Sequence, residues 1–169
     1  TFRILRQLLN RLDDAKTGEI VPSAFKVKIP DERLQQAQTT AQVMGQTVAG
    51  EFPFHPTTQA VTDNIHQLLL NRTWRPQLEI TGASGLPSLE QAGNVLRPVT
   101  AVKISLRIPP MLDVDAAAAA LKQLFEHDPP YGAQVSFEPE WGAAGWSAPP
   151  LAPWLERALN GASQEFFGK

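Results

Sequence analysis

Two side chains in the segment 93–110 carry groups that could hold a carboxylate or a carbonyl oxygen. Asn94 lies before the turn-forming Pro98, and Arg107 lies near the other end of the segment. A planar guanidinium can bind a carboxylate through paired hydrogen bonds, and an amide can donate to a carbonyl oxygen. From residue type alone, Asn94 is equally typical of a turn after Gly93, and Arg107 of a solvated strand face.

The residues between these two side chains alternate between apolar and polar types. One face would carry Val102, Ile104, Leu106 and Ile108, and the other Lys103, Ser105 and Arg107. A period of two is the pattern of a half-buried strand, because successive side chains of a strand point to opposite faces. The alternation therefore predicts a strand over 102–108 with Arg107 on its polar face.

Composition narrows the class of protein. The chain has 169 residues, 43% of them hydrophobic, which suits one folded domain with a core. Fifteen basic and 17 acidic side chains give a net charge of −2, so we expect no nucleic-acid partner. The absence of cysteine removes disulfides, thiolate metal sites and cysteine nucleophiles.

Targeting signals are also lacking in the sequence. No apolar run approaches the length of about 20 residues that a membrane span requires, and the first residues form no signal-peptide core. We therefore expect a cytoplasmic protein with no membrane partner. Because the sequence starts without Met, we also expect it to be part of a longer protein.

Periodicity predicts the remaining elements. Helices are expected over 1–14, 31–44 (with Asp31 as its N-cap), 62–71, 113–127 and 153–166, and strands over 77–82 (with Leu78 and Ile80 facing inward), 102–108 and 134–138. The segment 23–30 is expected to be a short strand or an extended arm. The thin apolar stripe after Asp31 indicates a solvated excursion over about 31–60, and a Gly/Ala/Pro-rich linker covers 142–150.

The order of these elements predicts an α+β fold. Helix, strand, strand, helix and strand in one sheet favour a ferredoxin-like sandwich, in which an antiparallel sheet carries its helices on one face. The strand that should precede the first helix is missing from the sequence. Its central place would be filled by upstream sequence, by the extended residues 25–29, or by a neighbouring chain.

No catalytic residue or metal ligand is predicted within the chain. His55, His66 and His127 have no metal-ligand spacing and are expected to be structural or exposed, and Ser84 lacks the spacing of a nucleophile elbow. Nothing in the pattern places two carboxylates around a substrate. The carboxylates considered are Asp13, Asp14, Glu138 and Glu140.

Three segments together resemble a known family. Residues 74–82 read WRPQLEITG, 94–98 read NVLRP, and 105–110 read SLRIPP before an acidic helix start. This combination resembles the lid of the dinuclear-zinc exopeptidases of peptidase family M-20, which includes carnosine dipeptidases, aminoacylases, glutamate carboxypeptidases and desuccinylases. The similarity is closest to the carnosine-dipeptidase-like branch and covers about 1–14 and 74–140.

The resemblance implies a role for each candidate residue. In this family the lid is a ferredoxin-like domain that caps the substrate and pairs two subunits. The position matching Arg107 binds the substrate's C-terminal carboxylate. The position matching Asn94 helps to hold the substrate or its tetrahedral intermediate, often across the dimer, where an amide can donate to a developing oxyanion.

The resemblance also implies a parent enzyme. That enzyme would be a metal-dependent dipeptidase, carboxypeptidase or deacylase that hydrolyses dipeptides or N-acyl amino acids with two zinc (or manganese or cobalt) ions. Residues 1–141 would be its lid and dimerization domain, and 142–169 a linker with the first helix of the returning catalytic domain. The metal ligands, the general-base glutamate and the His-Ser-Gly loop have no counterpart here, and the last of these would lie upstream of Thr1.

Two other functions stay open. The chain could be a stand-alone ferredoxin-like module that binds a small acidic ligand or a partner strand, or a relative that lost its metals and kept only dimerization. Metal ligands in the sequence beyond Thr1 and Lys169 would favour the lid. For the expected homodimer, the helix over 1–14 and an edge strand are the candidate interface, because edge-to-edge pairing removes exposed backbone groups.

Overall fold

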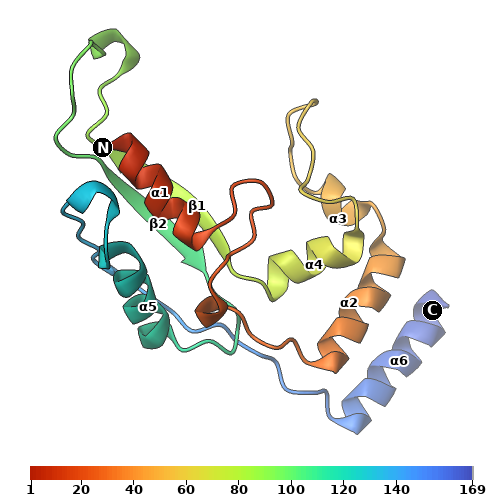
Figure 1. The fold of residues 1–169 in the computed structure, drawn as a ribbon. Coiled ribbons are helices and arrows are strands. Elements are labelled where there is room, and N and C mark those ends of the chain that lie inside the picture. The colour runs from red at the N-terminus through yellow and green to blue at the C-terminus, as the bar shows by residue number, and fades with distance from the viewer. Residues whose placement is uncertain (169) are drawn as a thin grey trace.

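A small sheet with two helices on one face forms one side of the molecule (Figure 1). The computed structural model describes residues 1–168. The sheet is made by β1 (Gln77–Ser84) and β2 (Ala101–Arg107), and α1 (Phe2–Leu12) and α5 (Val114–Glu126) pack on it. This confirms the predicted α+β fold and the helices at both predicted places.

The two strands pair antiparallel in one register. Gln77 lies opposite Arg107, and Leu78 lies opposite Leu106. A bulge between Ile80 and Gly82 adds one residue to β1, and Ile80, which was predicted to face the core, is 49% exposed. The alternation of side chains in β1 is interrupted at this bulge, so the period of two does not continue past Ile80.

The core lies between the helices and the sheet. The buried members of the cluster come from α1, α5 and the connection after α1, and they are Leu8, Leu12, Ile20, Phe25, Ala117, Leu121 and Phe125. Phe25 is only 1% exposed and ends a short 3₁₀ turn, η1 (Ser23–Phe25). The chain from Phe25 to Pro30 then runs extended outside the sheet, so the arm is confirmed and the strand is not.

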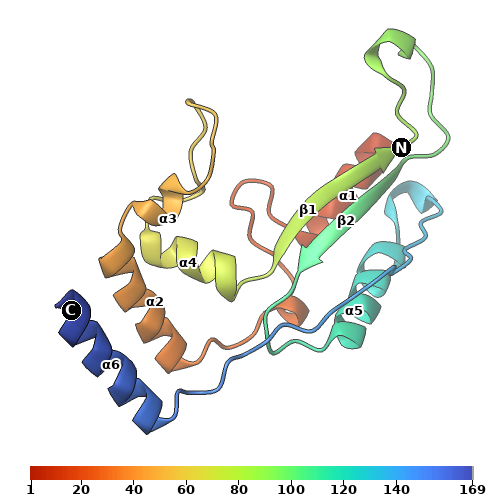
Figure 2. The same ribbon diagram turned by 180° about the vertical axis from the view of Figure 1, so that it is seen from behind.

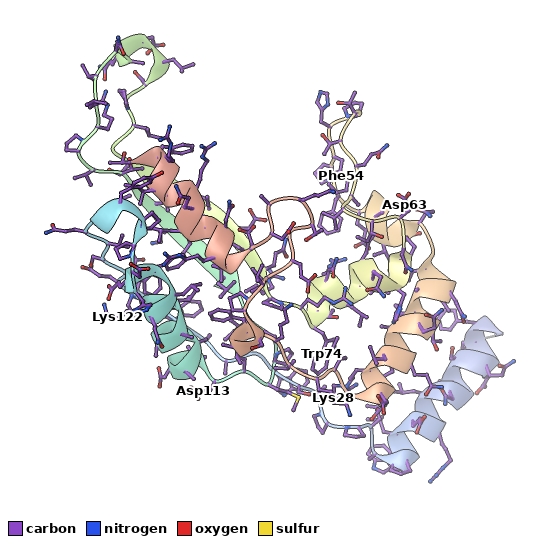
Figure 3. The ribbon with its side chains drawn as sticks, in the orientation of Figure 1. Lys28, Phe54, Asp63, Trp74, Asp113 and Lys122 are labelled. Carbon is purple, nitrogen blue, oxygen red and sulfur yellow. The ribbon has the colours of Figure 1, made fainter. Side chains whose placement is uncertain are left out.

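At both ends of α5, which begins after the Asp113 labelled in Figure 3, side chains bind backbone groups that lack helical partners. The Asp113 carboxylate accepts a hydrogen bond from the Ala116 N–H at 2.7 Å, as expected for an N-cap. At the other end the Arg11 guanidinium donates to the carbonyls of Leu124 (3.1 Å), His127 (2.7 Å) and Asp128 (2.6 Å). Arg11 therefore ties α1 to the end of α5, where carbonyls lack helical partners.

A second group of helices lies beside the sandwich. It contains α2 (Asp31–Met44), α3 (Thr47–Gly50) and α4 (Ile65–Thr73). No residue of α2 is buried, but Val48 of α3 is only 1% exposed, and the solvated excursion over about 31–60 stays a prediction. Asp31 was predicted as the N-cap, but it is the first helical residue and Pro30 precedes it. α4 begins at Ile65, later than predicted, because the Asn64 side chain caps it by accepting from the Gln67 N–H at 3.1 Å.

The predicted last strand, 134–138, is not a strand in the structure. Its side chains alternate as predicted, with Val135 and Phe137 packed against the core and Gln134, Ser136 and Glu138 exposed. Within the described residues, however, its backbone forms no hydrogen bond to another backbone segment. The pattern specified which side chains face inward, but a ladder also needs a neighbouring strand.

The C-terminal part leaves the sandwich. Residues 142–152 run without regular structure to α6 (Pro153–Phe167), which has no buried residue (Figure 2). The division of the chain into a lid and a returning helix stays a prediction. Over the described residues, no helix is long and apolar enough to cross a membrane.

Candidate functional site

Arg107 ends β2 on the polar face of the sheet. Its Cα is held by pairing with Gln77, and its side chain is exposed. Among residues 1–168 the guanidinium has no hydrogen bond and no ion pair. A cation on a fixed strand with all its donors free can bind a planar anion such as a carboxylate.

The neighbours of Arg107 on this face leave its charge uncompensated. Lys103 lies on the same face of β2 as Arg107, and it forms an ion pair with Glu140. Glu79 is the cross-strand carboxylate nearest in register, opposite Ser105, and it forms no ion pair with Arg107. Arg107 is therefore the cation of this face that could bind a ligand.

Asn94 lies in the long loop 85–100 that joins β1 to β2. Its side chain is exposed and has no hydrogen-bond partner within the described part of the chain. The loop projects beyond the start of β2 and away from the helices (Figure 1). The two ends of the loop lie close together at Gly85 and Val99, which we call the neck of the loop. A Cβ at Gly85, where φ is +82°, would lie 2.4 Å from the Val99 carbonyl oxygen, so only glycine fits.

The two candidate residues lie at opposite ends of β2. Arg107 is the last residue of this seven-residue strand, whereas Asn94 lies in the loop that precedes it. At about 3.3 Å per residue the strand alone separates them by about 20 Å. A single protomer therefore does not bring Asn94 and Arg107 into one site.

Sequence reasoning missed the apolar side chains around Asn94. Leu89 is 95% exposed and Leu96 is 98% exposed, and both lie in the same loop. Leu89 and Leu96 lie in a segment that contains Gly and Pro residues and has no helical or strand period. The sequence therefore gives no indication of whether their side chains face inward or outward. The tip of the loop therefore combines an amide with apolar surface.

The histidines behave as structural or surface residues. The His55 Nδ1 lies 3.0 Å from the Thr57 hydroxyl, and His127 is the C-cap of α5. The Nε2 atom of His66 is buried and has no hydrogen-bond partner among the residues that the structure describes. Within residues 1–168 no group of three or more His, Cys, Asp or Glu side chains could hold a metal ion.

The perturbed carboxyl groups also belong to structural features. Hydrogen bonds from the Thr17 and Lys16 amides hold the pKa of Asp14 below its ordinary value in a turn. The Lys122 ammonium and then the Phe137 amide lower the pKa of Glu126. Neither carboxylate lies on the polar face with Arg107, so these shifts do not mark a general acid or base.

Comparison with known proteins identifies a related fold. No protein-family model matches the chain, and no curated protein matches it in sequence. Among solved structures it is similar to the dipeptidase Dug1p from Saccharomyces cerevisiae, with a TM-score of 0.53 and 21% identity. The match covers 73% of this chain and 25% of the dipeptidase chain, so this chain corresponds to about a quarter of that protein. At this identity the similarity shows a shared fold.

Proposed function

We propose that this chain is the lid and dimerization domain of a longer metal-dependent hydrolase that acts on dipeptides or N-acyl amino acids. The observation that carries the proposal is the fold shared with one quarter of a dipeptidase, together with the free guanidinium of Arg107. The sequence resemblance to the family M-20 lid supports the same conclusion independently, because it rests on the segments around β1 and β2.

Arg107 would bind the free carboxylate of the substrate. A guanidinium offers two parallel donors to a carboxylate, and its position at the end of a paired strand limits its movement. A hydrogen bond to a charged group contributes about 1.5–3 kcal/mol. Arg107 would therefore select substrates that end in a carboxylate over the corresponding amides.

Asn94 would act in the site of a second subunit. The loop 85–100 directs it away from Arg107 of the same protomer, and its amide group can donate to an oxygen that gains negative charge. In the proposed two-fold dimer, each loop would face the other subunit, because both subunits contribute the same surface. The exposed Leu89 and Leu96 would then be covered in the assembly.

The metal ions would be held outside this chain. The described residues contain no suitable ligand cluster, so this domain does not fit a zinc site of its own. In the proposed parent protein, zinc supplies the hydrolytic chemistry. This domain contributes substrate binding and the subunit contact.

Substitution of Arg107 in the natural full-length protein tests this role. We expect Arg107→Ala to raise KM about 10- to 100-fold for a substrate with a free carboxylate, the equivalent of the lost charge-assisted bonds. The matching amide substrate should be affected far less. Arg107→Lys should recover only part of the loss, because an ammonium cannot form the paired bonds.

Arg6→Ala is the matched control, because Arg6 is an exposed arginine of α1 without a side-chain partner in the described structure. It should leave the ratio of kcat/KM for the two substrates unchanged. Equal kinetics of the unsubstituted enzyme on carboxylate and amide substrates would refute the assignment of Arg107.

A further inference from the structure

Glu79 shares the polar face of the sheet with Arg107. It lies opposite Ser105 in the strand register, and Gln77, two residues earlier, lies opposite Arg107. The bulge of β1 begins only after Ile80, so the pairing is regular at these positions. Residues directly opposite each other in an antiparallel pair point to the same face. These four side chains therefore form one group, which we call the polar patch.

The polar patch is open to solvent. All four of its side chains are exposed. The apolar side chains of the same strands, among them Leu78, Ile104 and Leu106, pack on the other face against the core. Figure 2 shows the two strands from the polar face, with α1 behind them. A ligand can therefore reach the polar patch without moving a described element.

Two opposite charges of the polar patch have no partner in the chain. Among residues 1–168, neither the Arg107 guanidinium nor the Glu79 carboxylate forms an ion pair. Lys103, the other cation on this face of β2, is already paired with Glu140. Because Gln77 and Ser105 are neutral, the polar patch presents one free positive charge beside one free negative charge.

The spacing of these two charges favours a ligand that is itself extended. Glu79 lies opposite the residue two positions before Arg107, so the two are diagonal neighbours in the sheet. Diagonal neighbours lie about 7–8 Å apart. A ligand with an anionic group at one end of an extended chain and a cationic group at the other end can contact both residues at once. An α-carboxylate and an α-ammonium, which are joined through one carbon atom, span less.

The proposed reaction decides which cation a substrate can offer. In a dipeptide or an N-acyl amino acid, the nitrogen next to the terminal carboxylate belongs to the bond that is hydrolysed, so it carries no charge. Only the side chain of the C-terminal residue can then place a positive charge near that carboxylate. Lysine and arginine carry this charge at the end of an extended side chain.

We propose that Glu79 is a specificity-determining residue that selects substrates with a C-terminal lysine or arginine. Arg107 would bind the terminal carboxylate, and Glu79 the ammonium or guanidinium of the side chain. Gln77 lies beside Arg107 and would donate its amide N–H to a remaining lone pair of the same carboxylate. The inference rests on the proposed function, because it needs a substrate carboxylate at Arg107.

Hydrolysis of matched dipeptides by the natural full-length protein tests this role. Alanyl-lysine and alanyl-norleucine differ chiefly in the side-chain charge. We expect the ratio of their kcat/KM values to fall about 3- to 5-fold in Glu79→Gln, as for the loss of a solvent-exposed ion pair. Glu79→Lys should raise kcat/KM for alanyl-glutamate above that for alanyl-lysine. In the unsubstituted protein the preference for alanyl-lysine should weaken as the salt concentration rises.

Glu138→Gln is the matched control for the removal of a negative charge. Glu138 is an exposed carboxylate that forms no ion pair in the described part of the chain, but it lies outside the two paired strands. It should leave the ratio for alanyl-lysine and alanyl-norleucine unchanged. An equal fall in Glu138→Gln and Glu79→Gln would assign the preference to the overall charge and overturn the inference.

Arg107→Ala separates a failure of this inference from a failure of the proposed function. If Arg107→Ala impairs the hydrolysis of all three dipeptides but Glu79→Gln leaves the ratio unchanged, only the role of Glu79 is wrong. If Arg107→Ala changes none of them, the carboxylate site is wrong and the role of Glu79 falls with it. A protein that hydrolyses neither these dipeptides nor the corresponding N-acetyl amino acids would contradict both proposals.

Discussion

Arg107 differs from several other arginines of the chain in having no intramolecular role. Arg11 binds carbonyls at the end of α5, Arg72 pairs with Glu51 at 3.1 Å, and Arg75 donates to Asn71 at 2.7 Å. Each of these three arginines therefore has a partner within the chain. Arg107 shares its lack of a partner with Arg6, but it is held at the end of a paired strand, which is why we propose a ligand for it.

Arg11 provides the clearest stability prediction at the residue scale. Arg11→Ala would remove the donor to the partly buried Leu124 carbonyl of α5 and to the exposed carbonyls of His127 and Asp128 just after it. We expect the free energy of unfolding to fall by about 1–3 kcal/mol. Denaturant unfolding of the variant measures it, with Arg6→Ala as the control that removes an exposed guanidinium of the same helix. Equal midpoints for the two variants would show that these bonds contribute nothing.

At the scale of elements, local patterns specified the helices and the faces of the strands. The period of two in 102–108 assigned Arg107 to the polar face correctly, and the acidic start of the helix predicted at 113 lies at the N-terminus of α5. Residues 134–138 show where this reasoning ends. Their inward and outward side chains were predicted, but a strand also depends on a backbone partner distant in sequence, which no local pattern contains.

The neck of the loop 85–100 is the element-scale feature most sensitive to substitution. Gly85→Ala would place a Cβ against the Val99 carbonyl at positive φ, so we expect a loss of about 1–3 kcal/mol in stability. Gly93→Ala in the same loop is the matched control, because nothing lies within 4 Å of its Cβ position. Thermal unfolding distinguishes the two, and a Gly85→Ala variant as stable as Gly93→Ala would contradict the described neck.

At the scale of the whole molecule, the sandwich is only part of what the chain presents. α6 exposes Trp154, Phe166 and Phe167, and the loop tip exposes Leu89 and Leu96. Large apolar surfaces of this kind typically mark contacts with other domains or subunits. The candidate site is predicted only in part: Asn94 and Arg107 stay predictions, and one copy of the chain does not bring them together.

We propose that this domain belongs to a larger metal-dependent hydrolase. The most direct test is the mass and metal content of the natural protein, purified from its source with an antibody against this domain. We expect a polypeptide several times longer than 169 residues that carries zinc, manganese or cobalt and hydrolyses dipeptides or N-acyl amino acids. A metal-free product of about the size of this chain would contradict it and would favour a stand-alone binding module.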